Sequence, residues 1–113
     1  MDDFPTLSGY RLMWIFVMFD LPVGTRSERK AATGFRNHLL DLGFEMTQYS
    51  IYMRLISGKE RLAAVMRQIE SELPESGVIK ALTITDKQFE NMVTWHGISR
   101  RKREKNPDQL ALF

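Results

Sequence analysis

The sequence predicts an α+β fold in which one antiparallel sheet carries two helices on the same face. Three observations lead to this prediction. Residues 12–20 form an almost purely apolar run, residues 25–43 and 57–74 show helical apolar periodicity, and residues 44–55 and 78–85 have the character of strands. The resulting order of strand, helix, strand or hairpin, helix and strand is that of the ferredoxin-like βαββαβ sandwich.

The composition is that of one small domain. A chain of 113 residues with 43% hydrophobic residues buries a single modest core. The sequence contains no cysteine, which excludes disulfides and thiolate metal sites and favours a cytoplasmic location. We expect a flexible leader at 1–10, a ferredoxin-like domain at 11–94 and a C-terminal extension at 95–113. An acidic start and a charged residue that interrupts the apolar run argue against export or contact with a membrane.

The first strand ends in a candidate functional residue. The apolar run that begins at Leu12 lacks polar alternation, which is typical of a strand buried on both faces. Asp20 ends the run, and Pro22 and Gly24 then turn the chain. A carboxylate at the carboxyl end of a central strand often takes part in chemistry. The alternative is that Asp20 only accepts hydrogen bonds from the turn that follows it.

The first helix is predicted from its start signal and its apolar stripe. Thr25 and Glu28 have the spacing of a capping box, and Gly43 is placed to end the helix in a left-handed conformation. The apolar residues recur at helical spacing, and they are Ala31, Phe35, Leu39 and Leu42.

The second helix and the last strand follow in the same way. Ser57 and Glu60 form a second possible capping box, and Pro74 ends the helical pattern. The apolar stripe of this helix consists of Leu62, Val65, Met66, Ile69 and Leu73. Residues 75–77 form a turn before the strand at 78–85, on which Val78, Leu82 and Ile84 share one side. Asp86 is expected to cap a short helix that runs through Val93.

Residues 44–55 alternate with a period of two, so they are expected to be strand. The more apolar set is predicted to face the core, and it consists of Thr47, Tyr49, Ile51, Met53 and Leu55. Gln48, Ser50 and Arg54 would then face outward or toward a partner. The segment is long for one strand, and a bend near residues 48–50 would divide it into two, although no Gly, Asn or Pro marks a tight turn there.

Basic residues gather in two clusters although the formal net charge is only +2. One cluster follows the Asp20 turn and consists of Arg26, Arg29, Lys30 and Arg36. The other lies at residues 100–105, near the end of the chain. Such clusters attract nucleic acid by neutralising phosphates and releasing counterions. A plain solvated surface is the alternative reading for each of them.

Several of these motifs together resemble a known family, the CRISPR-associated endoribonuclease family Cas-two. The matching motifs run in order and spacing from Ser8 to Phe89, and they are Phe19-Asp20-Leu21-Pro22, Phe35-Arg36, Gly43-Phe44 and Gln48-x-Ser50-Ile51-Tyr52-x-Arg54. The Ser-Gly-Tyr-Arg sequence before the first strand and the Phe-Asp-Leu-Pro motif are most similar to the form found in loci with a single large effector nuclease. The leader and the basic tail match least.

The resemblance implies a ferredoxin-like homodimer that acts in adaptive antiviral defence. It implies a metal-dependent endonuclease acting on single-stranded RNA or on DNA, with Asp20 as the catalytic residue that would hold Mg²⁺. It also implies an adaptor that binds duplex DNA and the CRISPR-associated integrase, Cas-one, when new spacers are acquired. Gln48 and Ser50 would support either the dimer contact or the hydrogen bonding around Asp20. Neither His38 nor His96 presents itself as a general base.

Three functional hypotheses therefore remain. The first is a Mg²⁺-dependent nuclease that uses a pair of Asp20 side chains brought together by a two-fold axis. The second is a purely structural adaptor that grips DNA phosphates with Arg26, Arg29, Lys30 and Arg36. The third, an unrelated RNA-binding domain, is disfavoured because the aromatic sheet motif of RNA recognition modules is absent. Residues 95–113 would add an edge strand, a docking peptide or a frayed tail.

Overall fold

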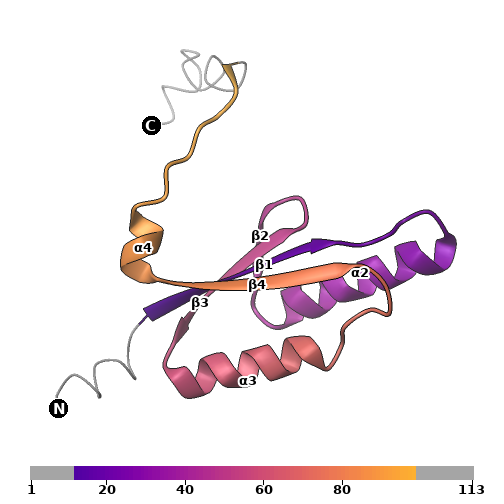
Figure 1. The fold of residues 1–113 in the computed structure, drawn as a ribbon, viewed down its shortest axis with the longest axis horizontal. Helices are drawn as coiled ribbons and strands as arrows, with labels where there is room; N and C mark the ends of the chain where they lie inside the picture. Colours follow the sequence, from indigo (N-terminus) through magenta and orange to yellow (C-terminus); the bar gives the residue numbers. More distant parts are fainter. Residues whose placement is uncertain (1–11, 99–113) are drawn as a thin grey trace.

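A computed structural model describes residues 12–98 of the chain as a sheet with its two long helices on one side (Figure 1). The elements in order are β1 (Leu12–Asp20), α2 (Arg26–Asp41), β2 (Glu45–Gln48), β3 (Ile51–Ser57), α3 (Lys59–Glu70), β4 (Val78–Thr85) and α4 (Asp86–Glu90). The sheet has the strand order β2-β3-β1-β4, and every neighbouring pair is antiparallel. This topology confirms the predicted ferredoxin-like fold.

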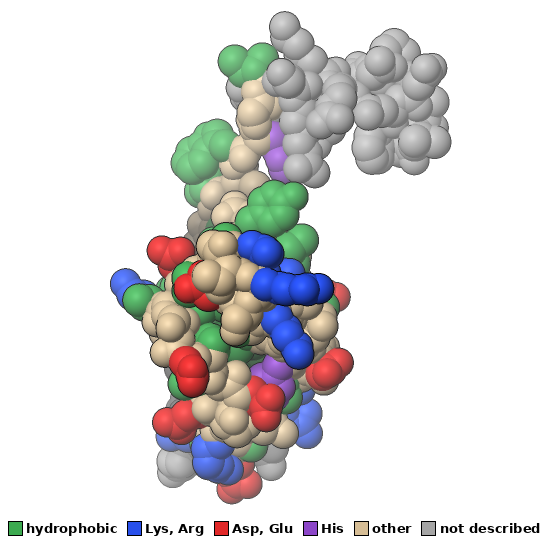
Figure 2. Space-filling view, turned by 90° about the vertical axis from the view of Figure 1, so that its right-hand side faces the viewer, with side chains coloured by type: hydrophobic (Ala, Val, Ile, Leu, Met, Phe, Trp, Pro, Cys, Tyr) green, Lys and Arg blue, Asp and Glu red, His purple; other side chains and the backbone are tan. Residues whose placement is uncertain are grey.

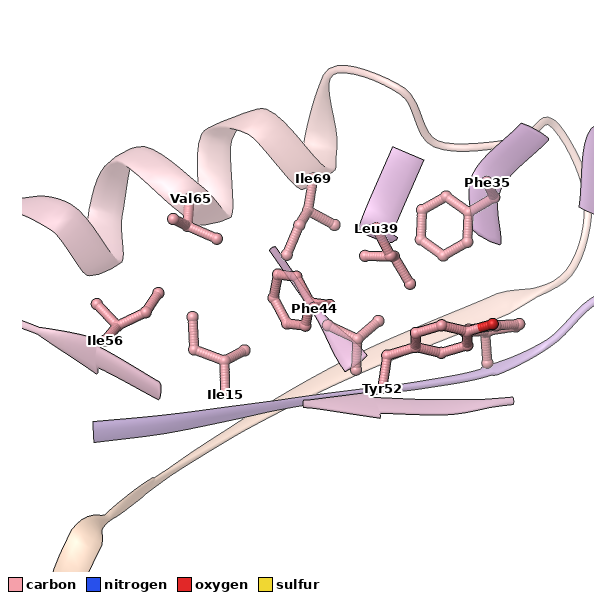
Figure 3. Close-up of a cluster of buried hydrophobic side chains, with 10 residues drawn as sticks. Ile15, Phe35, Leu39, Phe44, Tyr52, Ile56, Val65 and Ile69 are labelled. Atoms are coloured by element: carbon pink, nitrogen blue, oxygen red, sulfur yellow. The ribbon is translucent and has the colours of Figure 1, made fainter. Parts of the chain in front are cut away.

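One face of the sheet packs against α2 and α3 to form the core. Strand β1 contributes Ile15, Val17 and Phe19, and all three are buried. The other members of the core come from both helices, from β3 and from the start of the hairpin (Figure 3), and they are Phe35, Leu39, Phe44, Tyr52, Ile56, Val65 and Ile69. Phe19 meets Phe35 edge to face, with ring centroids 5.4 Å apart. The core therefore lies directly behind the strand that ends in Asp20.

The opposite face of the sheet, which we call the open face, is apolar and largely uncovered. Its central strand presents Trp14, Phe16 and Met18, which are only half buried. The strand register places Leu82 opposite Phe16 on this face, and Leu82 is 51% exposed. The prediction that β1 is buried on both faces is thus wrong for a single chain. The apolar run of β1 instead provides a core on one side and a bare apolar surface on the other.

Helix α4 covers one end of the open face. The Trp14 indole stacks on the Phe89 ring with centroids 4.1 Å apart, and the Trp14 Nε1–H donates to Asp86 Oδ1 at 2.8 Å. The expected capping role of Asp86 is wrong, because Thr85 is the N-cap and forms a capping box with Gln88. The helix also ends at Glu90, before the predicted end at Val93. Beyond α4, residues 91–98 lead away from the sheet (Figure 1).

Helix α2 has the predicted caps. Thr25 accepts from the Glu28 N–H at 3.1 Å, the Glu28 side chain accepts from the Thr25 N–H at 2.9 Å, and Gly43 has a φ of 87°. The buried residues of the helix are Ala32, Phe35 and Leu39, so Ala31 was placed in the apolar stripe in error. His38 Nε2–H donates to the Gln68 carbonyl oxygen at 2.7 Å, which ties α2 to α3.

Helix α3 has the predicted apolar stripe but a different start. Its N-cap is Gly58, with a φ of 93° and no side-chain cap, so the predicted capping box at Ser57 is wrong. Ser57 remains the last residue of β3, and the left-handed turn that glycine allows begins the helix one residue later. The helix ends at Glu70, so the predicted end at Pro74 and the place of Leu73 in the stripe are wrong. Leu73 lies beyond the helix and is 46% exposed.

The segment 44–55 is a hairpin whose faces are opposite to those predicted. Residues 49–50 form the turn between β2 and β3, which confirms the alternative of two strands with a bend. Tyr52 and Ile56 enter the core, whereas Ile51, Met53 and Leu55 lie on the open face. Arg54 also lies on the helix side rather than outward, and its Nη1–H donates to the Leu42 carbonyl oxygen at the carboxyl end of α2.

Several predictions concern residues outside 12–98. The leader at 1–10 and the basic cluster at 100–105 both lie outside the described residues, and only residues 95–98 of the expected extension are described. No strand is formed at 91–98. Within the described part of the chain, no helix has the length and the apolar character that crossing a bilayer requires.

Replacing either of two glycines by alanine should change the stability of the protein, in opposite directions. Gly77 has a φ of 100°, and a Cβ there would lie 2.6 Å from Leu21 Cδ2 and 2.7 Å from the Asp20 carbonyl oxygen. Gly77→Ala should therefore lower the free energy of unfolding by about 2 to 4 kcal/mol. Gly34 lies inside α2, where an added Cβ meets nothing within 4 Å, so Gly34→Ala should raise that free energy by about 1 kcal/mol. Urea denaturation at one protein concentration measures the free energy of unfolding of each variant. The same change in both variants would contradict the close packing at Gly77.

Candidate functional site

Asp20 lies at the carboxyl end of β1, and its side chain is exposed. It pairs with Val78 of β4, and it shares the parity of Phe16 and Met18 along β1. Because residues two apart on a strand point to the same face, the Asp20 carboxylate lies at one end of the open face. The sequence-based placement of a carboxylate at this sheet end is correct, and the structure adds the face on which it lies.

The backbone around Asp20 is held from both neighbouring strands. On one side the Phe19 N–H donates to the Ser50 carbonyl oxygen at 3.0 Å, which ties the hairpin turn to β1. On the other side Gly77 packs against the Asp20 carbonyl, where only a glycine fits. Ser50 has a φ of 65° and is the only non-glycine residue of the described chain with a positive φ. Left-handed backbone at such a residue costs roughly 1 to 2 kcal/mol.

A groove of about 540 Å³ opens beside Asp20. The hairpin turn forms one wall through Tyr49 and Ser50, and the first part of β4 forms the other through Val78 and Lys80. Ser50 therefore lies beside Asp20, while its predicted role in the dimer contact or in the hydrogen bonding around Asp20 stays a prediction. Tyr49 and Lys80 are new members, because the register that places them beside Asp20 is visible only in the folded sheet.

Gln48 occupies a different position from Ser50. It is the last residue of β2 and pairs with Ile51 of β3. Strand β3 therefore separates Gln48 from β1, and Gln48 is not among the residues that line the Asp20 groove. Its proposed role in supporting the dimer or the site stays a prediction.

A basic stripe runs along α2. Arg26, Arg29 and Lys30 line one shallow groove of about 550 Å³ together with Thr33 and Asn37. The Arg29 Nη1–H donates to the Val23 carbonyl oxygen at 3.2 Å, which anchors the guanidinium near the start of the helix. Figure 2 views the molecule from the right-hand side of Figure 1, where α2 begins. On this face Lys and Arg side chains gather in one area, and acidic side chains are scattered around it.

Arg36 lies further along α2 than the other three basic residues. It is partly buried, and its Nη2–H donates to Thr33 Oγ1 at 3.2 Å. Arg36 is not among the residues that line the groove of the basic stripe. Arg26, Arg29 and Lys30 therefore line a common groove, and Arg36 lies outside this groove, further along α2.

The donor set near Asp20 restricts how a metal ion fits. Within residues 12–98, no group of three or more His, Asp or Glu side chains lies close enough to share one metal ion. Mg²⁺ does not need such a cage, since it keeps several waters and is often held by one or two carboxylates together with substrate phosphates. An exposed Asp20 beside an open groove fits this second mode of binding.

These features define a class of protein. The chain is a ferredoxin-like α+β protein with one exposed carboxylate at the end of an apolar sheet face and a basic stripe on its first long helix. Comparison with known proteins then identifies the family. The family model described as CRISPR associated protein Cas2 matches residues 13–92, and the chain belongs to this family.

Individual relatives match over nearly the whole chain. A protein of Paracidovorax avenae named CRISPR-associated endoribonuclease Cas2 is 52% identical over 107 residues, which cover 95% of this chain and 99% of the relative. A protein of Flavobacterium psychrophilum with the same name is 44% identical over 112 residues, which cover 99% of this chain and 97% of the relative. A third, from Parvibaculum lavamentivorans, is 40% identical over 101 residues, which cover 89% of this chain and 100% of the relative.

Proposed function

We propose that this chain is a metal-dependent endonuclease of CRISPR-based antiviral defence, which works as a homodimer and uses Asp20 to act on single-stranded RNA or on DNA. The proposal extends to this chain the activity for which its relatives are named. The observation that carries it is the position of Asp20. Its carboxylate is exposed, it lies at the end of the open face, and it borders a groove of about 540 Å³.

A second copy of the chain is the proposed cover of the open face. Away from the groove beside Asp20, the exposed apolar residues of this face include Leu12, Leu55 and Leu82, which are between 41% and 51% exposed. An apolar surface of this kind is unfavourable in water, and a two-fold dimer buries the same patch from both copies. Because Asp20 lies on this same face, an axis near this end would bring the two carboxylates toward one phosphate.

The proposed reaction is hydrolysis of a phosphodiester. A water oxygen forms a new bond to phosphorus, the bond to the leaving oxygen breaks, and the proton of the water ends on that leaving oxygen. When bound, Mg²⁺ supplies Lewis-acid stabilisation of the charge that develops on the phosphate oxygens. Asp20 would hold the ion and orient the phosphate within the groove. His38 binds the Gln68 carbonyl and does not line the groove beside Asp20, so no role as a base is assigned to it.

Metal removal tests the nuclease. EDTA is expected to lower the cleavage rate of single-stranded RNA by more than ~100-fold, since Lewis-acid stabilisation is worth several kcal/mol, and added Mg²⁺ is expected to restore it. Light scattering in EDTA should still report the dimer, because the proposed interface is apolar. Cleavage that continues unchanged in EDTA would refute a metal-dependent reaction.

A second function, as an adaptor for spacer acquisition, is favoured by the basic stripe on α2. Arg26, Arg29 and Lys30 share one groove along the helix and are exposed. A dimer carries two such stripes, which would follow the phosphates of a duplex without reading its sequence. The proposed partners in this role are duplex DNA and the CRISPR-associated integrase, Cas-one. In its strict form this alternative assigns no biological role to hydrolysis.

Charge reversal tests the adaptor. Combined Arg26→Glu, Arg29→Glu and Lys30→Glu changes are expected to weaken duplex binding by at least ~100-fold, and removing three phosphate contacts should reduce the salt slope of binding by roughly 3. Combined Lys59→Glu, Arg61→Glu and Arg67→Glu changes on α3 are the matched control, because these residues are exposed and lie outside the groove of the basic stripe. Fluorescence anisotropy across a salt series measures both quantities. Equal losses in the two proteins would show that only overall charge matters.

A further inference from the structure

We propose that the groove beside Asp20 is a binding site for one nucleotide of a single strand, in which the Tyr49 ring stacks on the base and the Lys80 ammonium holds the adjacent phosphate. This inference rests on the proposed nuclease function and assigns two further substrate-binding residues to it. The two side chains lie on opposite walls of the groove, with Asp20 between them.

Tyr49 is placed for stacking rather than for packing. It occupies the first position of the two-residue turn between β2 and β3, and its side chain is 91% exposed. Within residues 12–98 its phenol makes no hydrogen bond, and its ring has no aromatic partner. A fully exposed aromatic ring contributes almost nothing to this fold. Next to a nucleic-acid site, however, it offers a surface on which any base can stack.

The turn that carries Tyr49 is held at a defined distance from the carboxylate. The next residue, Ser50, adopts the left-handed conformation, and its carbonyl oxygen accepts from the N–H of Phe19, the residue before Asp20. Strained backbone persists where its surroundings over-determine it, and it is concentrated at binding sites. The ring is therefore presented on a rigid support beside the site.

Lys80 supplies a positive charge to the other wall. It is exposed, and the register places it opposite Met18 on the open face, diagonal to the Asp20 and Val78 pair. Diagonal neighbours on a sheet lie about 7 to 8 Å apart, within reach of a long side chain. In the described part of the chain the Lys80 side chain takes part in none of the side-chain hydrogen bonds. Its ammonium is thus free to neutralise a phosphate that Asp20 alone would repel.

The arrangement selects a single strand over a duplex. In a duplex each base is already stacked and paired, so the Tyr49 ring reaches no base face without unstacking one, which costs a few kcal/mol. A base of a single strand turns onto the ring freely, while its phosphate lies in the groove. The basic stripe of α2, by contrast, contacts phosphates alone and does not distinguish the two forms.

The experiment compares the binding of a labelled single-stranded RNA and of the same sequence as a duplex, in EDTA so that no strand is cut. Tyr49→Ala is expected to weaken single-strand binding roughly 5- to 150-fold and to leave duplex binding unchanged, whereas Tyr49→Phe should bind like the parent protein. Lys80→Ala should reduce the salt slope of single-strand binding by about 0.7. The controls are Trp95→Ala, which removes a ring that is 81% exposed outside the groove, and Lys87→Ala on α4.

The outcomes separate this site from the nuclease itself. Single-strand binding by Tyr49→Ala that equals the parent's would overturn the stacking site even if cleavage persists. If the variants show these binding losses but the parent protein does not cut RNA, the nuclease function is refuted and the binding site is retained. If Tyr49→Ala changes the oligomeric state, Tyr49→Trp provides the readout instead. Its fluorescence should be quenched by single-stranded RNA and not by duplex, and equal quenching by the two would also overturn the proposal.

Discussion

Asp20→Asn is expected to abolish cleavage, with a loss of about 100-fold or more in rate, while leaving the fold and the dimer intact. Asparagine keeps the shape of the side chain but removes the charge that binds Mg²⁺. Because the Asp20 side chain is exposed and makes no hydrogen bond within residues 12–98, its loss should cost little stability. Single-turnover cleavage of single-stranded RNA measures the rate, and circular dichroism and light scattering check fold and dimer.

Asp41→Asn is the matched control for this substitution. Asp41 is also exposed, but it is the last residue of α2 and lies outside the groove at Asp20. Its variant should cleave at the parent rate. Full activity in Asp20→Asn would remove Asp20 from the reaction and, with it, the proposed metal site.

The same Asp20→Asn protein also separates the two proposed functions when spacer acquisition is measured in cells. If cleavage vanishes and acquisition continues, hydrolysis is incidental and the adaptor is the biological role. If both vanish together while the dimer persists, the purely structural reading is wrong. The two assays on one variant therefore decide whether hydrolysis is part of the biological role. The basic stripe and the Asp20 carboxylate are compatible with both functions.

Leu82→Glu is expected to convert the dimer to a monomer and to abolish cleavage with it. Leu82 lies opposite Phe16 on the open face and is 51% exposed. A glutamate there would bury one unpaired charge from each copy, which costs several kcal/mol, so the dimer dissociation constant should rise roughly 1000-fold or more. Sedimentation over a range of protein concentrations measures this constant.

Leu40→Glu is the control for the interface. Leu40 is an exposed leucine on α2, and at 50% its exposure is nearly equal to that of Leu82. Its variant should remain dimeric and active, because α2 covers the other face of the sheet. A dimer that survives Leu82→Glu would mean that the copies associate through another surface or not at all.

The order of elements was predictable from the sequence because most elements carry redundant signals. Helix α2 has a capping box, an apolar stripe and a terminal glycine, and all three point to the same boundaries. The predicted start of α3 was wrong because its signals were not redundant. Two adjacent residues, Ser57 and Gly58, offer competing starts, and the backbone geometry that selects Gly58 is not encoded in the spacing of Ser57 and Glu60.

The hairpin faces were predicted in the wrong phase because both faces of this sheet are apolar. The set that includes Ile51 and Met53 is the more hydrophobic in sequence, yet it lies on the open face, while Tyr52 and Ile56 fill the core. Period-two patterns identify the core side only when the other side is polar. The error therefore follows from the apolar character of both faces of the sheet.

The candidate site was predictable in part. Asp20 was identified because a carboxylate ends an apolar run, which is a local signal. Tyr49 and Lys80 come from separate elements, and only the pairing of β1 with β3 and β4 brings them to one groove. Arg36 was identified as one of several basic residues close together in the sequence. Its hydrogen bond to Thr33 and its place beside the basic stripe depend on which side of α2 faces the sheet.

The stacking of Trp14 on Phe89 sets the carboxyl-terminal limit of any shortened fragment. A protein truncated after β4 would keep β1 to β4, yet it would lose both the aromatic partner and the Asp86 acceptor of the Trp14 indole. The exposed indole would then leave an apolar surface at that end of the open face, where other chains can associate. Fragments intended for crystallisation or domain exchange therefore have to extend beyond Glu90, and proteolytic trimming that stops short of α4 should yield aggregating material.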